Sequence, residues 1–165
     1  MHNSFDHQDL TGRGFVGFQL LHQLPRRCQH IPSDSGIYVA NLEPPVTGFL
    51  PRSVGGHCKG SDPTVPVARL EDKRLEGVPT LYIGRATDLR KRVDLLARYG
   101  RGEPVGHQGG RYLWQIAEHD NLRVAWKLDS DPVGAEAELL DEFEAAYGQL
   151  PFANLVRGSR PLAVA

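Results

Sequence analysis

The chain has 165 residues, of which 40% are apolar, and its formal net charge is −1 at pH 7. The length fits a single domain, and the balanced charge means that any anion-binding surface must come from local clustering of cations. No apolar run approaches the ~20 residues of a membrane span, and two cysteines cannot supply a disulfide framework. These features argue against an integral membrane protein and a small disulfide-stapled domain, and they predict a cytoplasmic location without membrane contact.

The first 34 residues form an extension that we expect to pack on the core of the domain. Residues 1–14 are polar and contain glycines, so they are predicted to be loose. Residues 15–24 mix apolar and polar side chains, and we expect a strand followed by a short helix there. A dense turn signal follows, and residues 37–40 are then predicted to form a β-strand in which Tyr38 faces opposite to its neighbours.

A long segment rich in proline and glycine, residues 43–79, separates this strand from the next apolar run. A short helix is expected within it, around residues 67–75. Because loop tips accept additions at little cost, we interpret the segment as an insertion between two strands. Two interpretations stay open, an arm that recognises a substrate and a lid.

The stretch of residues 81–93 combines strand-forming and helix-forming residues. Its first three residues favour a strand, Gly84 is expected to break that strand, and the basic remainder favours a helix. Arg92 lies at the edge of the apolar stripe of this helix, where a guanidinium can meet a phosphate without being wholly solvated. The stripe itself consists of Leu89, Val93 and Leu96.

Cations gather in and after this helix, whereas acidic residues gather between residues 129 and 144. The cationic residues are Arg85, Arg90, Lys91, Arg92, Arg98, Arg101 and Arg111. Such a cluster is either a phosphate-binding surface or a set of solvated helix faces, and the sequence favours neither interpretation.

Glycines surround His107 in residues 106–110, which suggests a loop that lets a ligand approach the backbone closely. His107 is therefore a candidate site residue, although a single loop histidine is also common on an ordinary surface. Residues 112–117 are predicted to form a short helix with Trp114 in the core. Residues 121–128 alternate between apolar and polar, which predicts a strand.

A helix is predicted from Asp131, as its N-cap, to about residue 147, with Gly148 just beyond its end. Glu136 falls in the middle of the apolar stripe of this helix, whereas the other carboxylates lie off it. A carboxylate on the apolar side is costly unless it is paired or binds a metal ion. Glu136 is therefore a candidate metal ligand, and an internal salt bridge or a wet position in the first turn are the alternatives.

These residues together resemble the GIY-YIG nuclease family. Residues 36–38 read Gly-Ile-Tyr, residues 82–84 read Tyr-Ile-Gly, and Arg92 follows at the offset of the family's arginine. The run from Tyr82 to Val93 is similar to the corresponding stretch of the excision-repair nuclease subunit in that family. The resemblance extends to the family's restriction and homing endonucleases, although most members join the two strands by a short hairpin rather than by a long insertion.

The C-terminal part carries the resemblance further. The family places a metal-binding glutamate ahead of an apolar pair in its last helix, followed by Pro-x-x-Asn, and Glu136 and residues 151–154 match this pattern. Counting back from Asn154 would select Glu142 instead, whereas the apolar stripe of the helix selects Glu136. The resemblance covers residues 35–155 and leaves residues 156–165 as a tail.

The resemblance implies an α+β fold in which helices flank a small antiparallel three-stranded sheet, with the long insertion between its first two strands. It implies a metal-dependent endonuclease that hydrolyses DNA phosphodiester bonds, leaving a 5′-phosphate and a 3′-hydroxyl. Glu136 would hold Mg²⁺, for which Mn²⁺ could substitute, and Arg92 would stabilise the charged transition state. Tyr38 or Tyr82 would orient or deprotonate the attacking water, and His107 is a further catalytic candidate.

The expected partner is DNA, most naturally double-stranded, and restriction, repair and mobile-element processing are all compatible roles. The expected nucleic-acid contacts are Gly84, Arg85, Lys91, Arg111 and Asn154. Specificity would come from the insertion, from the N-terminal extension or from a homodimer. The alternatives are a non-catalytic nucleic-acid-binding module on the same fold and a ribonuclease.

Overall fold

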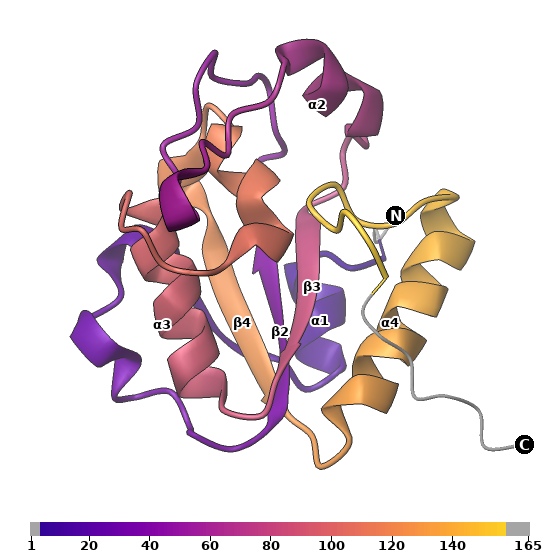
Figure 1. The fold of residues 1–165 in the computed structure, drawn as a ribbon. Helices are drawn as coiled ribbons and strands as arrows, with labels where there is room; N and C mark the ends of the chain where they lie inside the picture. Colours follow the sequence, from indigo (N-terminus) through magenta and orange to yellow (C-terminus); the bar gives the residue numbers. More distant parts are fainter. Residues whose placement is uncertain (1–3, 158–165) are drawn as a thin grey trace, which may run out of the picture.

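The computed structural model describes residues 4–157, and it has an α+β fold built on one antiparallel sheet (Figure 1). The strands within these residues are β1 (Val16–Leu20), β2 (Gly36–Asn41), β3 (Thr80–Ala86) and β4 (Arg123–Leu128), in the order β1-β4-β2-β3. The α-helices are α1 (His7–Gly12), α2 (Val67–Lys73), α3 (Leu89–Gly100) and α4 (Pro132–Tyr147). Short 3-10 helices are η1 (Leu21–Gln23), η2 (Arg26–Cys28), η3 (Cys58–Gly60), η4 (Gln108–Gln115) and η5 (His119–Asn121). The predicted class is confirmed, but the sheet has four strands rather than three.

The sheet separates two apolar clusters because alternate residues of a strand point to opposite faces. Tyr38 on β2 belongs to the cluster formed with α3 and η4, whereas its neighbours Ile37 and Val39 belong to the cluster formed with α1 and α4. The predicted orientation of Tyr38 is therefore confirmed. β2 pairs with β4 on one side and with β3 on the other, so β3 is an edge strand of the sheet.

The N-terminal extension is more ordered than its composition suggests. Residues 7–12 form α1, capped by the Asp6 side chain, so the prediction that residues 1–14 are loose is wrong for the described part. Phe5, Leu10 and Phe15 are all buried against the sheet, and this packing holds a helix too short to be stable alone. The strand and short helix expected in residues 15–24 are confirmed as β1 and η1. Because β1 pairs with β4, it supplies the fourth strand.

The predicted break at Gly84 is wrong, because β3 continues to Ala86 and Gly84 pairs directly with Tyr38. The helix that follows is confirmed: α3 begins after Asp88, whose side chain accepts a hydrogen bond from the Lys91 amide at 3.0 Å. The predicted stripe of Leu89, Val93 and Leu96 is fully buried.

The C-terminal helix follows its prediction closely. α4 begins after the N-cap Asp131 and ends before Gly148, which adopts the left-handed conformation with φ 78°. The apolar stripe, including Leu139, Leu140 and Phe143, is buried. β4 and the helical segment around Trp114 are also confirmed, although η4 begins earlier than expected.

The insertion (residues 43–79) contains the expected short helix, α2, and packs on the rest of the domain. Leu50 donates its amide to the Gln115 carbonyl at 2.7 Å, and Val54 donates to the Trp114 carbonyl at 2.9 Å. The Gln115 side-chain amide donates to the carbonyls of Leu50 and Val65, at 3.0 and 2.8 Å. The insertion therefore covers η4 rather than projecting freely from the two strands.

Replacing residues 43–79 by a two-residue hairpin turn is expected to prevent folding. Val46, Leu70 and Val78 are buried, and each contributes about 1.5–3 kcal/mol, against a typical total stability of about 5–15 kcal/mol. Circular dichroism and thermal unfolding would measure the effect, with removal of the exposed residues 59–61 as the control. Cooperative unfolding at the parent midpoint in the shortened chain would contradict this expectation.

Within residues 4–157, no helix is long and apolar enough to cross a membrane.

Candidate active site

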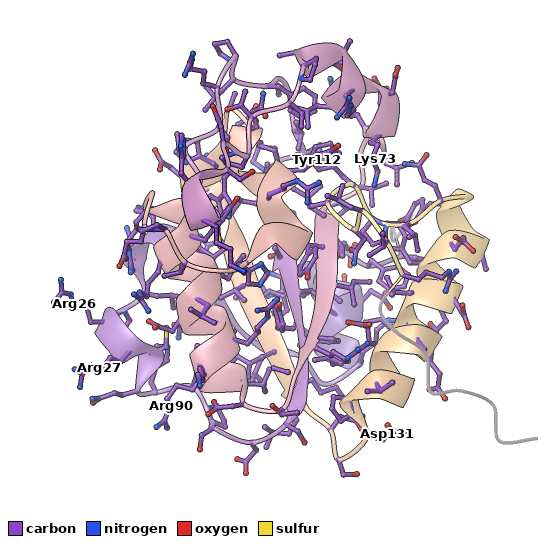
Figure 2. All side chains as sticks on the ribbon, viewed as in Figure 1. Arg26, Arg27, Lys73, Arg90, Tyr112 and Asp131 are labelled. Atoms are coloured by element: carbon purple, nitrogen blue, oxygen red, sulfur yellow. The ribbon has the colours of Figure 1, made fainter. Side chains whose placement is uncertain are left out.

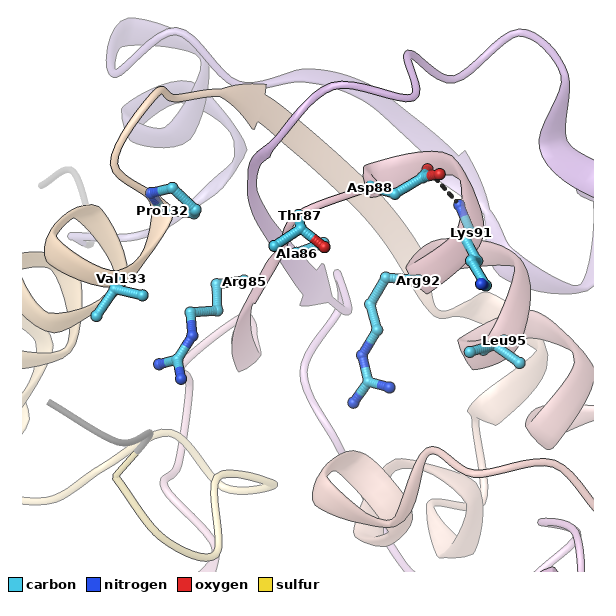
Figure 3. Close-up of a pocket in the computed structure, with 9 residues that line it drawn as sticks. All are labelled: Arg85, Ala86, Thr87, Asp88, Lys91, Arg92, Leu95, Pro132 and Val133. Atoms are coloured by element: carbon cyan, nitrogen blue, oxygen red, sulfur yellow. Dashed lines mark hydrogen bonds between the residues drawn. The ribbon is translucent and has the colours of Figure 1, made fainter. Parts of the chain in front are cut away.

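The site lies at the C-terminal end of β3, between α3 on one side and the start of α4 on the other (Figure 3). A hollow of about 420 Å³ opens there. Its lining consists of Arg85, Ala86, Thr87, Asp88, Lys91, Arg92, Leu95, Pro132 and Val133. The predicted site residues Arg85, Lys91 and Arg92 thus share one hollow, and the guanidinium groups of Arg85 and Arg92 point to the same side of it.

Two tyrosines and a histidine form a compact group beside this hollow. The Tyr38 hydroxyl lies 2.9 Å from His107 Nε2, and the ring centroids of Tyr38 and Tyr82 are 5.9 Å apart. The Tyr82 and His107 rings are 5.8 Å apart. A neutral imidazole has one N–H and one bare nitrogen, so it can pair with the Tyr38 hydroxyl in either tautomer. Three predicted catalytic residues that lie far apart in the chain are therefore in contact.

Burial makes the charged form of each of these groups unfavourable. It raises the pKa of Tyr38 well above the usual value, and the neighbouring Tyr82 raises it further. Burial likewise raises the pKa of Tyr82. The positive charge of Arg92 opposes both shifts, because a nearby cation favours a phenolate. Arg92 Nη1 lies 3.4 Å from the carbonyl of Gly106, the residue before His107, so Arg92 is beside this group of rings.

Burial also lowers the pKa of His107 to about 3, with the charge of Arg92 as the second cause. The unfolded chain, with a pKa of 6.5, therefore takes up a proton at higher pH than the folded protein. Stability should then fall as the pH drops from about 6.5 to about 3, by at most about 1.4 kcal/mol per pH unit for this group. Urea unfolding of the parent and His107→Gln between pH 7.5 and 4.5 would measure it. The variant should lose this slope, whereas parallel curves would contradict the assignment.

Glycines leave room for this group of rings. A Cβ atom on Gly84 would lie 2.6 Å from Tyr38 Cζ, so the absence of a side chain there admits the Tyr38 ring. A Cβ atom on Gly109 would lie 3.3 Å from the Tyr82 hydroxyl, and one on Gly110 would lie 3.4 Å from His107 Cε1. Gly109 and Gly110 thus leave room for the side-chain rings of Tyr82 and His107. Gly84 is buried beside the Tyr38 ring, and its predicted contact with nucleic acid stays a prediction.

Gly84→Ala is expected to destabilise the protein by about 1–3 kcal/mol, as overpacking in a filled core does. It should also displace the Tyr38 hydroxyl from His107. Gly48→Ala is the matched control, because nothing lies within 4 Å of a Cβ atom at that position. Chemical denaturation would compare the two variants, and equal stability would show that the Tyr38 ring can move aside.

Glu136 is buried next to Arg85, which lines the hollow, and its burial agrees with the apolar stripe of α4. Its side chain is 8% exposed, whereas that of Glu142 is 56% exposed and pairs with Arg13 at 2.5 Å. Arg85 Nη1 donates to Glu136 Oε1 at 2.8 Å. Burial raises the pKa of Glu136, and the charge of Arg85 opposes that shift. The internal salt bridge considered from the sequence is therefore present.

The residues around Glu136 fit Mg²⁺ better than a metal that needs several protein ligands. Among residues 4–157, no group of three or more His, Cys, Asp or Glu side chains is placed to hold a metal ion. Mg²⁺ usually keeps several waters and takes only one or two carboxylates together with substrate phosphates. A single buried carboxylate beside a cationic hollow meets that requirement.

Besides Gly84, two predicted contact residues lie outside the hollow. Arg111 lines a different depression together with Tyr99 and Asp62. The Asn154 side chain accepts from the Ile83 amide and donates to the Ile83 carbonyl, both at 2.9 Å. Asn154 therefore pairs with the edge of β3 and holds the strand that carries Tyr82, and its predicted contact with nucleic acid stays a prediction.

The sequence did not point to every residue of this site. Pro132 and Val133 line the hollow because α4 begins beside β3, and no local pattern signals that approach. Lys73 on α2 donates to the Asn154 carbonyl at 2.8 Å, and burial lowers its pKa. This contact links the insertion to the segment that holds β3, and no pattern in the sequence signalled it.

Comparison of the chain with protein-family models, with curated proteins and with solved structures finds no match.

Proposed function

We propose that the protein is a metal-dependent endonuclease that hydrolyses phosphodiester bonds in DNA. The observation that carries the proposal is one arrangement of side chains. Arg92 lines a cationic hollow and contacts the residue before His107, His107 bonds Tyr38 beside Tyr82, and Glu136 pairs with Arg85 of the same hollow. The resemblance of the chain to GIY-YIG nucleases, which rests on the same residues, supports it. The roles that we propose for such an enzyme are restriction, repair or the processing of mobile elements.

The hollow suits a phosphodiester. Arg85, Lys91 and Arg92 supply three cations, opposed in the lining by the carboxylate of Asp88, which already caps α3. A planar guanidinium can donate two parallel hydrogen bonds to phosphate oxygens. Arg92 would donate to the non-bridging oxygens as negative charge builds in the transition state. Lys91 is exposed and would contact a neighbouring phosphate.

The tyrosines would orient the attacking water. Tyr38 is fully buried with its hydroxyl at His107, whereas Tyr82 keeps 8% of its surface exposed, so Tyr82 is the one that meets the water. Both phenols are neutral at pH 7 because burial raises their pKa values, and Arg92 favours their ionisation. His107 and Tyr38 would hold the Tyr82 ring in place.

Glu136 would hold the metal ion through its carboxylate, which also accepts a hydrogen bond from Arg85 Nη1. A bound Mg²⁺ supplies positive charge that stabilises the leaving oxygen and the scissile phosphate. Arg85 would keep the Glu136 carboxylate ionised despite its burial, since its charge opposes the rise in the Glu136 pKa.

Nicking of a supercoiled plasmid with Mg²⁺, with Mn²⁺ and with EDTA tests the proposal. We expect cleavage that requires a metal ion and leaves ends that DNA ligase can seal, as a 5′-phosphate and a 3′-hydroxyl would. Cleavage of RNA alone would replace this proposal by a ribonuclease. Cleavage that persists in EDTA would exclude the role of Mg²⁺.

One observation favours a second candidate, a non-catalytic nucleic-acid-binding module. The ion pair between Arg85 and Glu136 neutralises the carboxylate that would bind the metal ion. Such a module would bind duplex DNA in the same hollow without cutting it. Binding without nicking, in the presence of either metal ion, would identify it.

A further inference from the structure

A second cationic depression lies on the other flank of α3. It measures about 400 Å³, and we call it the η2 surface. Its lining consists of Arg26, Arg27, Asp94, Arg98, Arg101 and Glu103. Figure 2 shows Arg26, Arg27 and Arg90 on the side of α3 that faces away from α4. Four guanidinium groups against two carboxylates give this surface a positive charge.

Two of the four arginines of the η2 surface are bonded to other groups of the protein, and two point into solvent. Arg98 Nε bonds to the Glu103 carboxylate at 3.1 Å, and Arg101 Nη2 donates to the Leu24 carbonyl at 2.9 Å. Arg26 and Arg27 are exposed, and among the side-chain hydrogen bonds and ion pairs of residues 4–157 neither guanidinium takes part. An anion that enters this depression would meet Arg26 and Arg27 as its unpaired partners.

The backbone of η2 turns these arginines outward. Arg27 and Cys28 both have left-handed backbone angles, with φ 65° and 46°, which residues other than glycine adopt uncommonly. Cys28 is buried in the core while Arg26 and Arg27 stay in solvent. η2 packs along α3 and is held there by the buried Cys28 and Ile31. Arg26 and Arg27 therefore lie on a turn that buried core residues hold in place.

α3 separates the η2 surface from the candidate active site. Arg92 and Leu95 face the active-site hollow, whereas Asp94 and Arg101 face the η2 surface. An α-helix with its side chains is about 10–12 Å across, and the major groove of B-DNA is about 12 Å wide. The two cationic depressions therefore lie on different flanks of one helix, whose width is comparable to that of the groove.

The outer ridge of α3 also carries cations. Lys91 and Arg98 are seven residues apart, which is nearly two helical turns, so they lie on one ridge about 10.5 Å apart along the axis. Lys91 is exposed and lines the active-site hollow, whereas Arg98 lines the η2 surface. A duplex that follows this ridge would stay in contact with cations from one depression to the other.

We infer that the η2 surface binds the phosphate backbone of duplex DNA, across a groove from the phosphodiester bond that is cut. The inference rests on the proposed function for the identity of the ligand. It assigns a binding role to the N-terminal extension, through Arg26 and Arg27. Such contacts add affinity and orientation without reading the base sequence.

The salt dependence of DNA binding tests this inference. Fluorescence anisotropy of a labelled duplex, measured in EDTA over a series of salt concentrations, would compare the parent with Arg26→Ala/Arg27→Ala. Each lost phosphate contact lowers the slope of log affinity against log salt by about 0.9, so the double variant should lose about 1.8. Its Kd at low salt should rise by about tenfold. The half-saturation concentration for plasmid nicking should rise in parallel.

Two matched variants separate a phosphate contact from a general charge effect. Arg26→Lys/Arg27→Lys keeps both charges and should keep the parent slope. Arg123→Ala/Lys127→Ala removes two cations from β4, which line neither depression, and should also keep it. An unchanged slope in Arg26→Ala/Arg27→Ala would overturn the inference while leaving the nuclease intact. A parent that neither binds nor cuts duplex DNA would overturn the proposed function as well.

Discussion

Glu136→Gln is expected to abolish Mg²⁺-dependent cleavage, with a fall in rate of about 10³-fold or more. A metal ion contributes several kcal/mol of charge stabilisation to the transition state, and each 1.36 kcal/mol changes a rate tenfold. The amide has nearly the shape of the carboxylate and can still accept a hydrogen bond from Arg85, so the fold should persist. Plasmid nicking would measure the rate, and the salt-dependent affinity for duplex DNA should stay close to that of the parent.

Glu142→Gln is the matched control for this substitution. Glu142 lies on the same helix, but its side chain is 56% exposed and pairs with Arg13 outside the hollow. It should therefore cut at the parent rate. The opposite pattern, in which Glu142→Gln is inactive and Glu136→Gln is active, would move the metal site to Glu142. If Glu136→Gln loses stability but cuts normally, Glu136 serves only the ion pair with Arg85.

The elements with strong local signals could be predicted from the sequence. α4 has an Asp-Pro start, a glycine stop and a clear apolar stripe, and its observed bounds agree with the prediction. α1 has six residues, too few for a period to emerge, and it depends on the distant contacts of Phe5 and Leu10. Tertiary packing therefore decided this element against its local propensity.

Gly84 illustrates a second limit. Glycine serves both where the chain needs unusual backbone angles and where another group must approach closely. The sequence could not distinguish these uses, because the ring that approaches Gly84 belongs to Tyr38, on the neighbouring strand. From the sequence, Gly84 is expected to break the strand through unusual backbone angles. In the structure, Gly84 instead allows the close approach of the Tyr38 ring.

The sequence predicted which residues belong to the candidate site better than it predicted their contacts with one another. The helical period alone placed Glu136 toward the interior, and its burial follows from that period. The partner of Glu136 could not be predicted, since Arg85 lies on a strand 51 positions away. Likewise, Tyr38 and His107 meet across 69 positions. Arg111 was grouped with the other cations by proximity in sequence, yet it lines a different depression.

Arg92→Ala is expected to lower the cleavage rate by about 10²-fold or more, as the loss of one transition-state hydrogen-bond donor does. Its guanidinium lies in the hollow, with a contact of 3.4 Å from Nη1 to the Gly106 carbonyl. Its charge also favours ionisation of Tyr38 and Tyr82. The substitution therefore removes both a phosphate contact and a cation beside the phenols, and single-turnover cleavage at saturating protein would measure the loss.

Arg92→Lys separates these two contributions. Lysine keeps a positive charge near the phenols but lacks the planar pair of donors that can hold two phosphate oxygens. We expect it to recover only part of the rate lost in Arg92→Ala. Arg90→Lys is the matched control, because Arg90 lies on the same helix but donates to the Ile31 carbonyl and does not line the hollow. An Arg92→Lys variant as active as the parent would show that Arg92 acts through its charge and not through paired hydrogen bonds to the phosphate.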